Sequence, residues 1–166
     1  MKSSTIFDRF TALTLAMAVL FLVMAFVTSC KDDDENYLEG SITNAYNMGF
    51  DSVRIRLYPD SALSIEYVKK SDSGEKIPLR ITIDQPELML SSGADYNLKT
   101  TGSIGRGVGF DSMPLPALES GTIHLGSFGA TDGNGVSGDF EAVFTGTDGK
   151  RMNLNGGFSA KLDRVD

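Results

Sequence analysis

Hydrophobic and polar residues alternate along much of the chain from residue 37 onward. A period of two places successive side chains on opposite faces of a β-strand, so that one face is buried and the other meets water. The alternation is clearest in 53–57, 63–67, 77–83, 123–125, 140–144 and 152–162. Clusters rich in Gly, Asp, Ser and Asn separate these segments and predict turns. Because no helical period follows residue 30, we predict an all-β domain, either a single antiparallel β-barrel or a β-sandwich.

Two local features suggest how the predicted sheet bends. Pro78 removes a backbone donor from the segment 77–83, which predicts an edge, a bulge or a strand start at that position. In the segment 104–110, three glycines line one face of a strand. The residues between them share the other face: Ile104, Arg106, Val108 and Phe110. A glycine-lined face lets another group pack closely or lets the sheet bend, and bending in a small barrel is the interpretation that we favour.

The first 29 residues have the composition of a targeting segment. Lys2 and Arg9 precede an apolar run over 12–27, as in the charged and apolar regions of a secretory signal. The run is shorter than the about 20 residues that a membrane-spanning helix needs. We therefore predict a cleaved signal helix over 1–29. The alternative is a permanent anchor, if the apolar run is counted from Phe10.

The signal segment ends in Val27-Thr28-Ser29-Cys30, which resembles the bacterial lipobox of an aliphatic residue and two small residues before a cysteine. The resemblance implies that the Cys30 thiol takes a diacylglycerol, that the chain is cut before Cys30, and that the new amino group is acylated. Two or three acyl chains hold a protein stably at a membrane. The alternative is an uncleaved helix that ends in a cysteine. Cys30 is also the only cysteine, so the mature domain has no disulfide.

Lys31, Asp32 and Asp33 directly follow the predicted lipidated cysteine. They resemble the surface-export signal of Bacteroidota lipoproteins, in which a lysine and two acidic residues follow the acylated cysteine. The resemblance implies the outer leaflet of the outer membrane, facing the medium. The alternative is an acidic spacer on a lipoprotein that faces the periplasm. The predicted organisation is thus a signal peptide over 1–29, an acidic linker over 30–36 and an all-β domain over 37–166.

The mature chain is acidic. Without Lys2, Arg9 and Asp8 it holds 13 basic and 21 acidic residues, a net charge of −8. Such a domain repels nucleic acid and anionic lipid, so we predict no nucleic-acid partner and a membrane contact made through the lipid anchor alone.

The last predicted hairpin is the clearest unit of the chain. Its two strands, 136–144 and 154–160, place phenylalanine and alanine on one face and flank a Gly/Asp turn over 146–149. The pattern resembles the closing hairpin of small β-barrel lipoproteins, including uncharacterised Bacteroidota families and, more distantly, the barrel domains of transferrin-binding lipoproteins. It favours a lipocalin-like or calycin-like barrel and carries no information on function.

The residues of the common catalytic and metal sites are scarce. His124 is the only histidine, so a histidine-rich zinc site is excluded. Any Ser/His/Asp or Cys/His arrangement would depend on this single residue. We interpret it as an exposed strand residue. The segment 132–136 resembles the start of a calcium loop, but its third ligand position falls on Val136, and we predict a hairpin turn there. We predict no catalytic residue, no metal and no cofactor, although plentiful carboxylates leave an acid pair of the glycosidase type open.

The segment 111–118 is a long apolar stretch with two prolines and is predicted to be a rigid loop. It either closes one end of the barrel or presents Met113, Leu115 and Leu118 to a partner. Separately, Ser52, Ser61 and Ser112 each follow an aspartate and precede a small or aliphatic residue. These tripeptides resemble the Bacteroidota O-glycosylation site, a pattern that also recurs by chance.

Together these features predict a lipid-anchored outer-membrane protein exposed at the cell surface. We expect a non-catalytic ligand-binding or accessory module that recognises a glycan, a small haem-like ligand or an envelope protein. The alternative is a structural or adhesive subunit that docks another envelope protein through its apolar loop or an edge strand. An enzyme is the third possibility.

The lipid anchor is tested by replacing its attachment site. Cys30→Ala removes the thiol that would take the lipid, so we expect incorporation of labelled palmitate into the protein to be lost in growing cells. Label that persists in the variant would show that the lipobox interpretation is wrong.

Overall fold

The computed structural model describes residues 36–59, 62–110 and 112–165. The predicted features that lie outside these residues are the signal helix over 1–29, the lipobox residues Val27, Thr28 and Ser29, the lipidation site Cys30, the export residues Lys31, Asp32 and Asp33, and Ser61.

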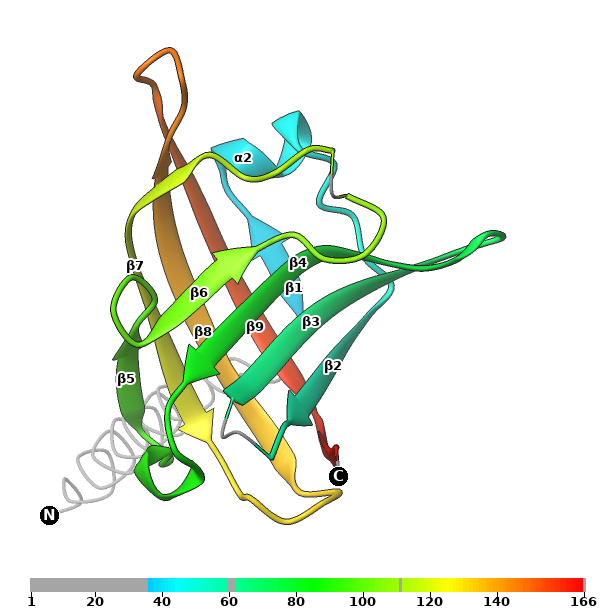
Figure 1. The fold of residues 1–166 in the computed structure, drawn as a ribbon, viewed down its shortest axis with the longest axis vertical. Helices are drawn as coiled ribbons and strands as arrows, with labels where there is room; N and C mark the ends of the chain where they lie inside the picture. Colours follow the sequence, from blue (N-terminus) through cyan, green and yellow to red (C-terminus); the bar gives the residue numbers. More distant parts are fainter. Residues whose placement is uncertain (1–35, 60–61, 111, 166) are drawn as a thin grey trace, which may run out of the picture. The chain divides into compact units, whose positions relative to one another are not determined.

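The described chain is mostly β and forms a nearly closed, mixed barrel of eight strands (Figure 1). Neighbouring strands follow the order β5-β7-β8-β9-β2-β3-β4-β6, and β1 pairs with β9 beside this path. The elements are β1 (Tyr37–Glu39), α2 (Ser41–Ala45), β2 (Ser52–Leu57), β3 (Ala62–Ser71), β4 (Gly74–Asp84), η1 (Glu87–Met89), β5 (Ala94–Asn97), β6 (Gly102–Gly105), β7 (Ala117–Ser127), β8 (Gly135–Thr145) and β9 (Arg151–Arg164). The prediction of a barrel or a sandwich is thereby resolved in favour of the barrel.

One strand pair is parallel, which corrects the prediction of an antiparallel sheet. β9 is 14 residues long, and two strands, β1 and β2, pair with the same edge of it. β1 pairs with it antiparallel at 155–157, and β2 pairs with it parallel at 162–164. Because the chain reverses its direction between β1 and β2, the second strand meets the same edge of β9 in the opposite sense.

The barrel also carries one short helix, α2, which the alternating pattern did not predict. α2 lies at one end of the barrel (Figure 1), where Ile42 is fully buried and Met48, just beyond the helix, is almost so. A helix of five residues buries only one side chain. It therefore shows no repeating apolar pattern that a sequence could reveal.

The barrel interior is filled by the chain's own side chains. The largest described side chains with almost no accessible surface are Tyr67, Phe144, Phe158, Ile42, Ile55, Leu63, Ile65, Leu79, Ile81, Ile83, Leu98 and Ile123. A side chain without accessible surface borders no space that a water molecule could enter. At the centre, the Tyr67 hydroxyl donates a hydrogen bond of 2.8 Å to the carbonyl of Gly157, and burial raises the pKa of Tyr67 far above its ordinary value. Edge-on contacts with the rings of Phe50 and Phe140 complete its surroundings.

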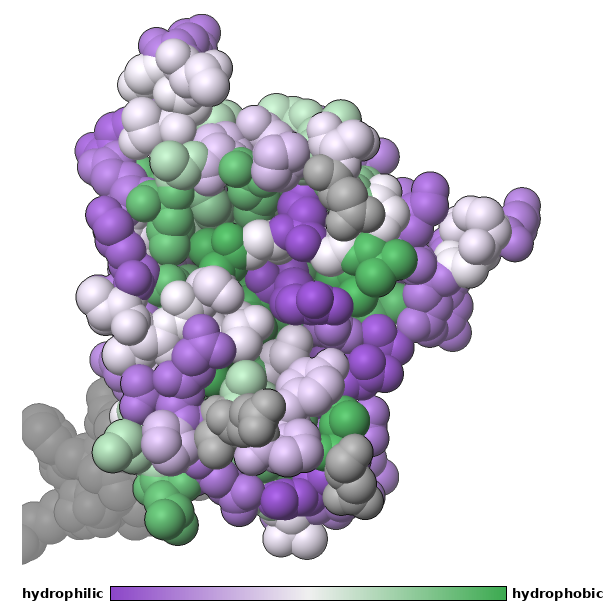
Figure 2. Space-filling model, in the orientation of Figure 1, coloured by the Kyte–Doolittle hydropathy of each residue, from purple (hydrophilic) through white to green (hydrophobic). Residues whose placement is uncertain are grey.

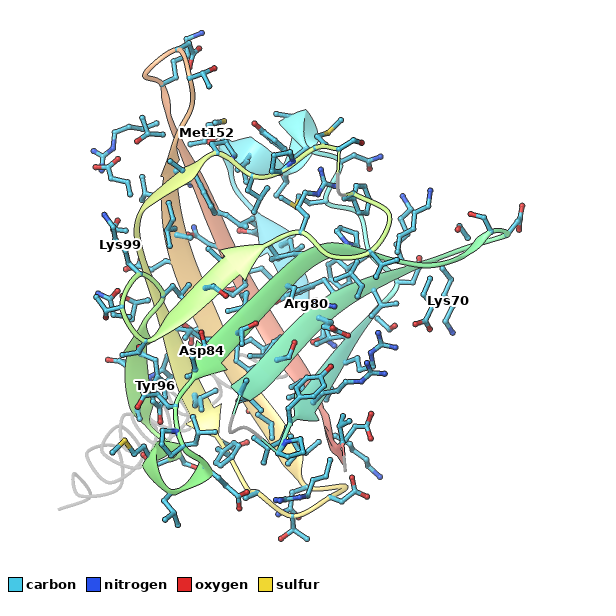
Figure 3. All side chains as sticks on the ribbon, in the orientation of Figure 1. Lys70, Arg80, Asp84, Tyr96, Lys99 and Met152 are labelled. Atoms are coloured by element: carbon cyan, nitrogen blue, oxygen red, sulfur yellow. The ribbon has the colours of Figure 1, made fainter. Side chains whose placement is uncertain are left out.

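Strand β3 is buried on both of its faces, although its alternating sequence predicts one wet face. Glu66, on the outward face, has no exposed surface. The strand register places it in a row with Arg54 on β2 and Arg80 on β4. Arg54 donates to the Glu66 Oε2 from Nε at 2.9 Å and from Nη2 at 2.8 Å. Arg80, which is labelled on β4 in Figure 3, donates to the Glu66 Oε1 over the same two distances. The two long arginine side chains satisfy the carboxylate and cover it from solvent.

Two predictions about local structure are confirmed. Pro78 lies at a β-bulge, because the register between β3 and β4 shifts between the pairs Tyr67↔Leu79 and Lys69↔Lys76. The last hairpin is formed by β8 and β9, and its turn is closed by hydrogen bonds between Gly146 and Lys150 and between Gly149 and Gly146. The phenylalanines that the pattern placed on one face, Phe140, Phe144 and Phe158, are all buried in the core.

The buried ion-pair row on the outer wall predicts a difference between two glutamates. Glu66→Gln leaves two arginines facing a neutral group, and we expect it to lower the free energy of unfolding by roughly 2–3 kcal/mol. Glu75→Gln removes only a half-exposed partner of Arg54, so its cost is expected to be below about 0.5 kcal/mol. Urea unfolding followed by circular dichroism measures both variants, and equal, small losses would contradict the central role of Glu66.

Candidate functional site

The barrel is left open between the two ends of its sheet. β6 pairs with β4 through Gly102–Gly105, and no other pairing of β6 occurs in the described part of the chain. β5 covers the edge of β7 only over 122–125, which leaves the first residues of β7 without a strand on that side. The free edge of β6 and the start of β7 thus face each other across an unclosed seam (Figure 1).

A groove of about 370 Å³ follows this seam. We call it the seam groove, and it is lined by Ile104, Gly105, Arg106, Phe110, Pro114, Leu115, Pro116 and Leu118. Figure 2 shows hydrophobic residues gathered in a hollow between β6 and the start of β7. Of the three residues predicted to meet a partner, Leu115 and Leu118 line the groove, whereas Met113 lies outside it with half of its surface exposed.

Arg106 is the only charged side chain among the described residues that line the seam groove. Its Nε donates a hydrogen bond of 3.2 Å to the carbonyl of Pro78, and its Cζ lies 3.7 Å from the centre of the Phe110 ring. Both terminal nitrogens, Nη1 and Nη2, are buried and have no hydrogen-bond partner within the described structure. Burial lowers the pKa of Arg106, an effect that the nearby Tyr46 partly opposes.

The local sequence explains how Arg106 reaches this position. β6 ends at Gly105, and the chain then stays against β4, because the Ile77 amide donates to the Val108 carbonyl and the Gly107 amide donates to the Ile77 carbonyl. A Cβ on Gly107 would lie 2.8 Å from the Cβ of Ile77, so glycine permits this close approach. The prediction of a strand over 104–110 is wrong beyond Gly105, because the chain leaves the extended conformation and turns at 108–109. Arg106 and Phe110 stack across this turn, while Val108 is 60% exposed.

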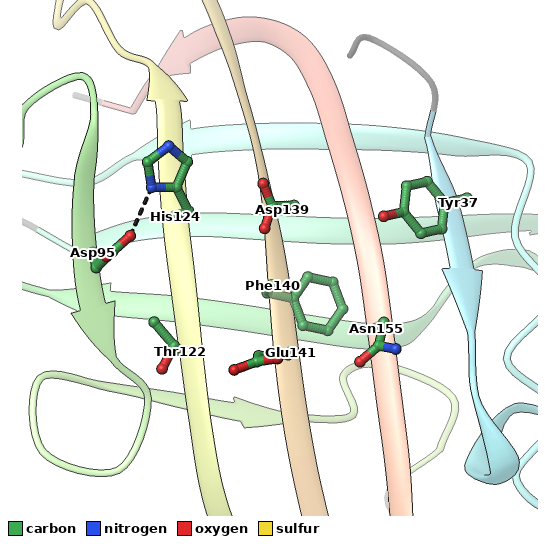
Figure 4. A pocket seen from close by; sticks show the side chains of 8 residues that line it. All are labelled: Tyr37, Asp95, Thr122, His124, Asp139, Phe140, Glu141 and Asn155. Atoms are coloured by element: carbon green, nitrogen blue, oxygen red, sulfur yellow. Dashed lines mark hydrogen bonds and ion pairs between the residues drawn. The ribbon is translucent and has the colours of Figure 1, made fainter. Parts of the chain in front are cut away.

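A second hollow, of about 460 Å³, lies on the outer wall of the barrel. It is lined by Tyr37, Asp95, Thr122, His124, Asp139, Phe140, Glu141 and Asn155, which come from five neighbouring strands (Figure 4). His124 Nδ1 and Asp95 Oδ1 are 2.6 Å apart, and both side chains are substantially exposed. His124 is therefore a strand residue on the outer face, as its neighbours Ile123 and Leu125 predicted. Among the described residues, no group of three His, Cys, Asp or Glu side chains could hold a metal ion.

The remaining predicted positions lie apart from the seam groove. Ser52, at the start of β2, and Ser112 are exposed, as a modified hydroxyl would need to be. The segment 132–136 covers the end of the turn between β7 and β8 and the first two residues of β8, and Asp132 accepts a hydrogen bond from the Arg164 amide. Within the ranges that the structure describes, no helix is both long and apolar enough to cross a bilayer.

Comparison with known proteins adds no relative: no family model, no curated protein and no solved structure matches the chain. The function must therefore be argued from the geometry of the barrel. The sequence pointed to Leu115 and Leu118, but it gave no signal for the role of Arg106, because the lack of a partner is a property of the folded chain.

Proposed function

We propose that the protein is a non-catalytic docking module of the cell surface, held at the outer membrane by lipid on Cys30. The seam groove receives an extended segment of another envelope protein. The observation that carries this proposal is the contrast between an interior filled by core side chains and an apolar groove beside a free strand edge.

The filled interior is what separates the two functions predicted from the sequence. Small-ligand sites are concave and bury most of their ligand, as the lumen of a lipocalin-like barrel does. The side chains at the centre of this barrel, such as Tyr67 and Phe158, leave no accessible surface toward such a lumen. A glycan or small ligand would have to bind outside the interior, for example in the hollow around His124 or in the one beside α2. Docking of a partner chain is therefore favoured over the binding of a small ligand.

The free edge of β6 offers backbone groups for an added strand. The Asp84 amide donates to the Thr101 carbonyl at 2.9 Å. Along a strand, successive residues turn their backbone N–H and C=O groups alternately toward one neighbour and away from it. Ser103 and Gly105, like Thr101, therefore turn theirs toward β4. Gly102 and Ile104 then turn theirs toward the seam. Added strands bind through such backbone hydrogen bonds, while pockets beside the edge select their side chains.

The sequence of β6 also lacks the features that protect an edge strand. Natural edges carry lysine, proline or inward charges that prevent other chains from pairing. Gly102-Ser103-Ile104-Gly105 has none of these, and Ile104 presents an apolar side chain at the groove. Only the brevity of the strand limits pairing.

The cellular address and the wider fold group belong to the same proposal. The lipobox and Lys31-Asp32-Asp33 support an outer-membrane protein that faces the medium, where envelope proteins are within reach. A calycin-like origin of the barrel is supported by its eight strands and its closing hairpin, and is opposed by the parallel contact between β2 and β9.

Cross-linking in intact cells tests the docking function. A photoreactive benzoylphenylalanine at Leu115 lies in the seam groove, so we expect it to give one discrete adduct of higher mass on illumination. Leu118→Lys places a charge in the groove and should abolish this adduct. The same probe at Lys150, which is 82% exposed in the turn between β8 and β9, is the control and should give none. Absence of an adduct at Leu115, or equal adducts at both positions, would contradict docking in the groove.

A further inference from the structure

Arg106 differs from every other arginine that the structure describes. The other five, Arg54, Arg56, Arg80, Arg151 and Arg164, each form an ion pair with an aspartate or a glutamate. Arg106 has no ion pair in the described structure, and only its Nε is hydrogen bonded. Its guanidinium stays charged even where burial lowers its pKa, because an arginine does not lose its proton in a protein.

The position of Arg106 makes this lack of a partner costly. Its two terminal nitrogens are covered, so water does not replace the missing hydrogen bonds. A buried charge is tolerated when it is paired and hydrogen bonded, and the stacking of Phe110 on the flat face of the guanidinium compensates only in part. The edge of the guanidinium, which carries Nη1 and Nη2, remains unsatisfied.

A carboxylate is the group that fits this edge. The guanidinium and a carboxylate are both planar, and two parallel hydrogen bonds join them. The described lining of the seam groove contains no acidic side chain that could serve from within the chain. The apolar residues around Arg106, among them Leu115 and Leu118, would exclude water from the ion pair. They would also contact apolar side chains of the ligand that flank its carboxylate.

We propose that the segment docked in the seam groove is an extended peptide that carries an acidic side chain between apolar residues, and that its carboxylate pairs with Nη1 and Nη2 of Arg106. This inference rests on the proposed docking function and names the chemistry of the partner. Because both nitrogens are covered in the free chain, the groups that cover them move aside when the carboxylate binds. The peptide backbone meanwhile pairs with the free edge of β6.

Two synthetic peptides that differ in one group test this inference. The first is acetyl-Thr-Val-Glu-Val-Thr-amide, and the second has Gln in place of Glu; both carry a neutral fluorescent dye. Fluorescence anisotropy measures their binding to the full chain, purified in detergent. We expect the Glu peptide to bind at least about tenfold more tightly than the Gln peptide, because a charge-assisted pair replaces a neutral one.

Variants of the chain assign the difference to Arg106. Arg106→Gln should remove the preference for Glu, while Arg106→Lys should retain only part of it, because lysine keeps the charge without the planar fork. Arg164→Gln, at an ion-paired arginine outside the groove, is the matched control and should leave the preference unchanged. Thermal unfolding checks that Arg106→Gln folds, and we expect it to melt no lower than the natural chain, because the substitution removes an unpaired charge.

The outcomes separate this inference from the docking function. Equal binding of both peptides, lost in Leu118→Lys, would overturn the role of the carboxylate and leave docking in the groove intact. A preference for Glu that survives Arg106→Gln would also overturn it. If neither peptide binds at about 1 mM, the inference is wrong, and the cross-link at Leu115 decides on docking separately. If decanoate binds through Arg106 and the peptides do not, the groove takes a fatty acid instead of a peptide.

Discussion

The packing of side chains inside the barrel decides where this protein can bind a partner. An eight-stranded barrel is just wide enough to be filled by side chains or to hold one small ligand. Here Tyr67, Phe144 and Phe158 occupy the centre without exposed surface, and a hydrogen bond to the Gly157 carbonyl fixes the Tyr67 ring. In the described part of the chain, the hollows that remain lie outside this interior: on the outer wall, beside α2 and along the open seam. On the outer wall over β3, the carboxylate of Glu66 is buried in ion pairs with the arginines of the neighbouring strands.

The open seam and the unpaired arginine are consequences of one arrangement. The sheet ends in β5 and β6, which are short and joined by one turn, so neither reaches far enough to close the barrel. After β6 the chain stays against β4 and holds Arg106 in an apolar groove whose described lining contains no carboxylate. The chain has a net charge of −7 and supplies a carboxylate to each of its other described arginines. The lack of such a partner at Arg106 is best understood as a site for a carboxylate from another molecule.

The sequence predicts features that depend on neighbours along the chain. Period-two alternation located β2, β3, β4, β7, β8 and β9 but not the short strands β1 and β5. The Gly/Asp cluster over 146–149 located the last turn, and Pro78 located a bulge. Features that depend on distant segments were missed or wrong. The parallel pair of β2 and β9 joins strands far apart in the sequence. The burial of both faces of β3 and the isolation of Arg106 follow from the register between strands, which local patterns do not encode. Leu115 and Leu118 were found because a long apolar segment is unusual in itself, but the prediction of a loop over 111–118 is wrong at its end, where Leu118 already lies on β7.

The central claim is that β6 keeps one edge free in the folded chain, and amide hydrogen exchange tests it most directly. Measured residue by residue by NMR, the Ser103 amide should be protected by its pairing with β4. The Ile104 amide, which faces the seam, should exchange at least about 100-fold faster. Protection of both amides to the same degree would mean that β6 is paired on both sides, and it would contradict the open seam on which the docking function depends.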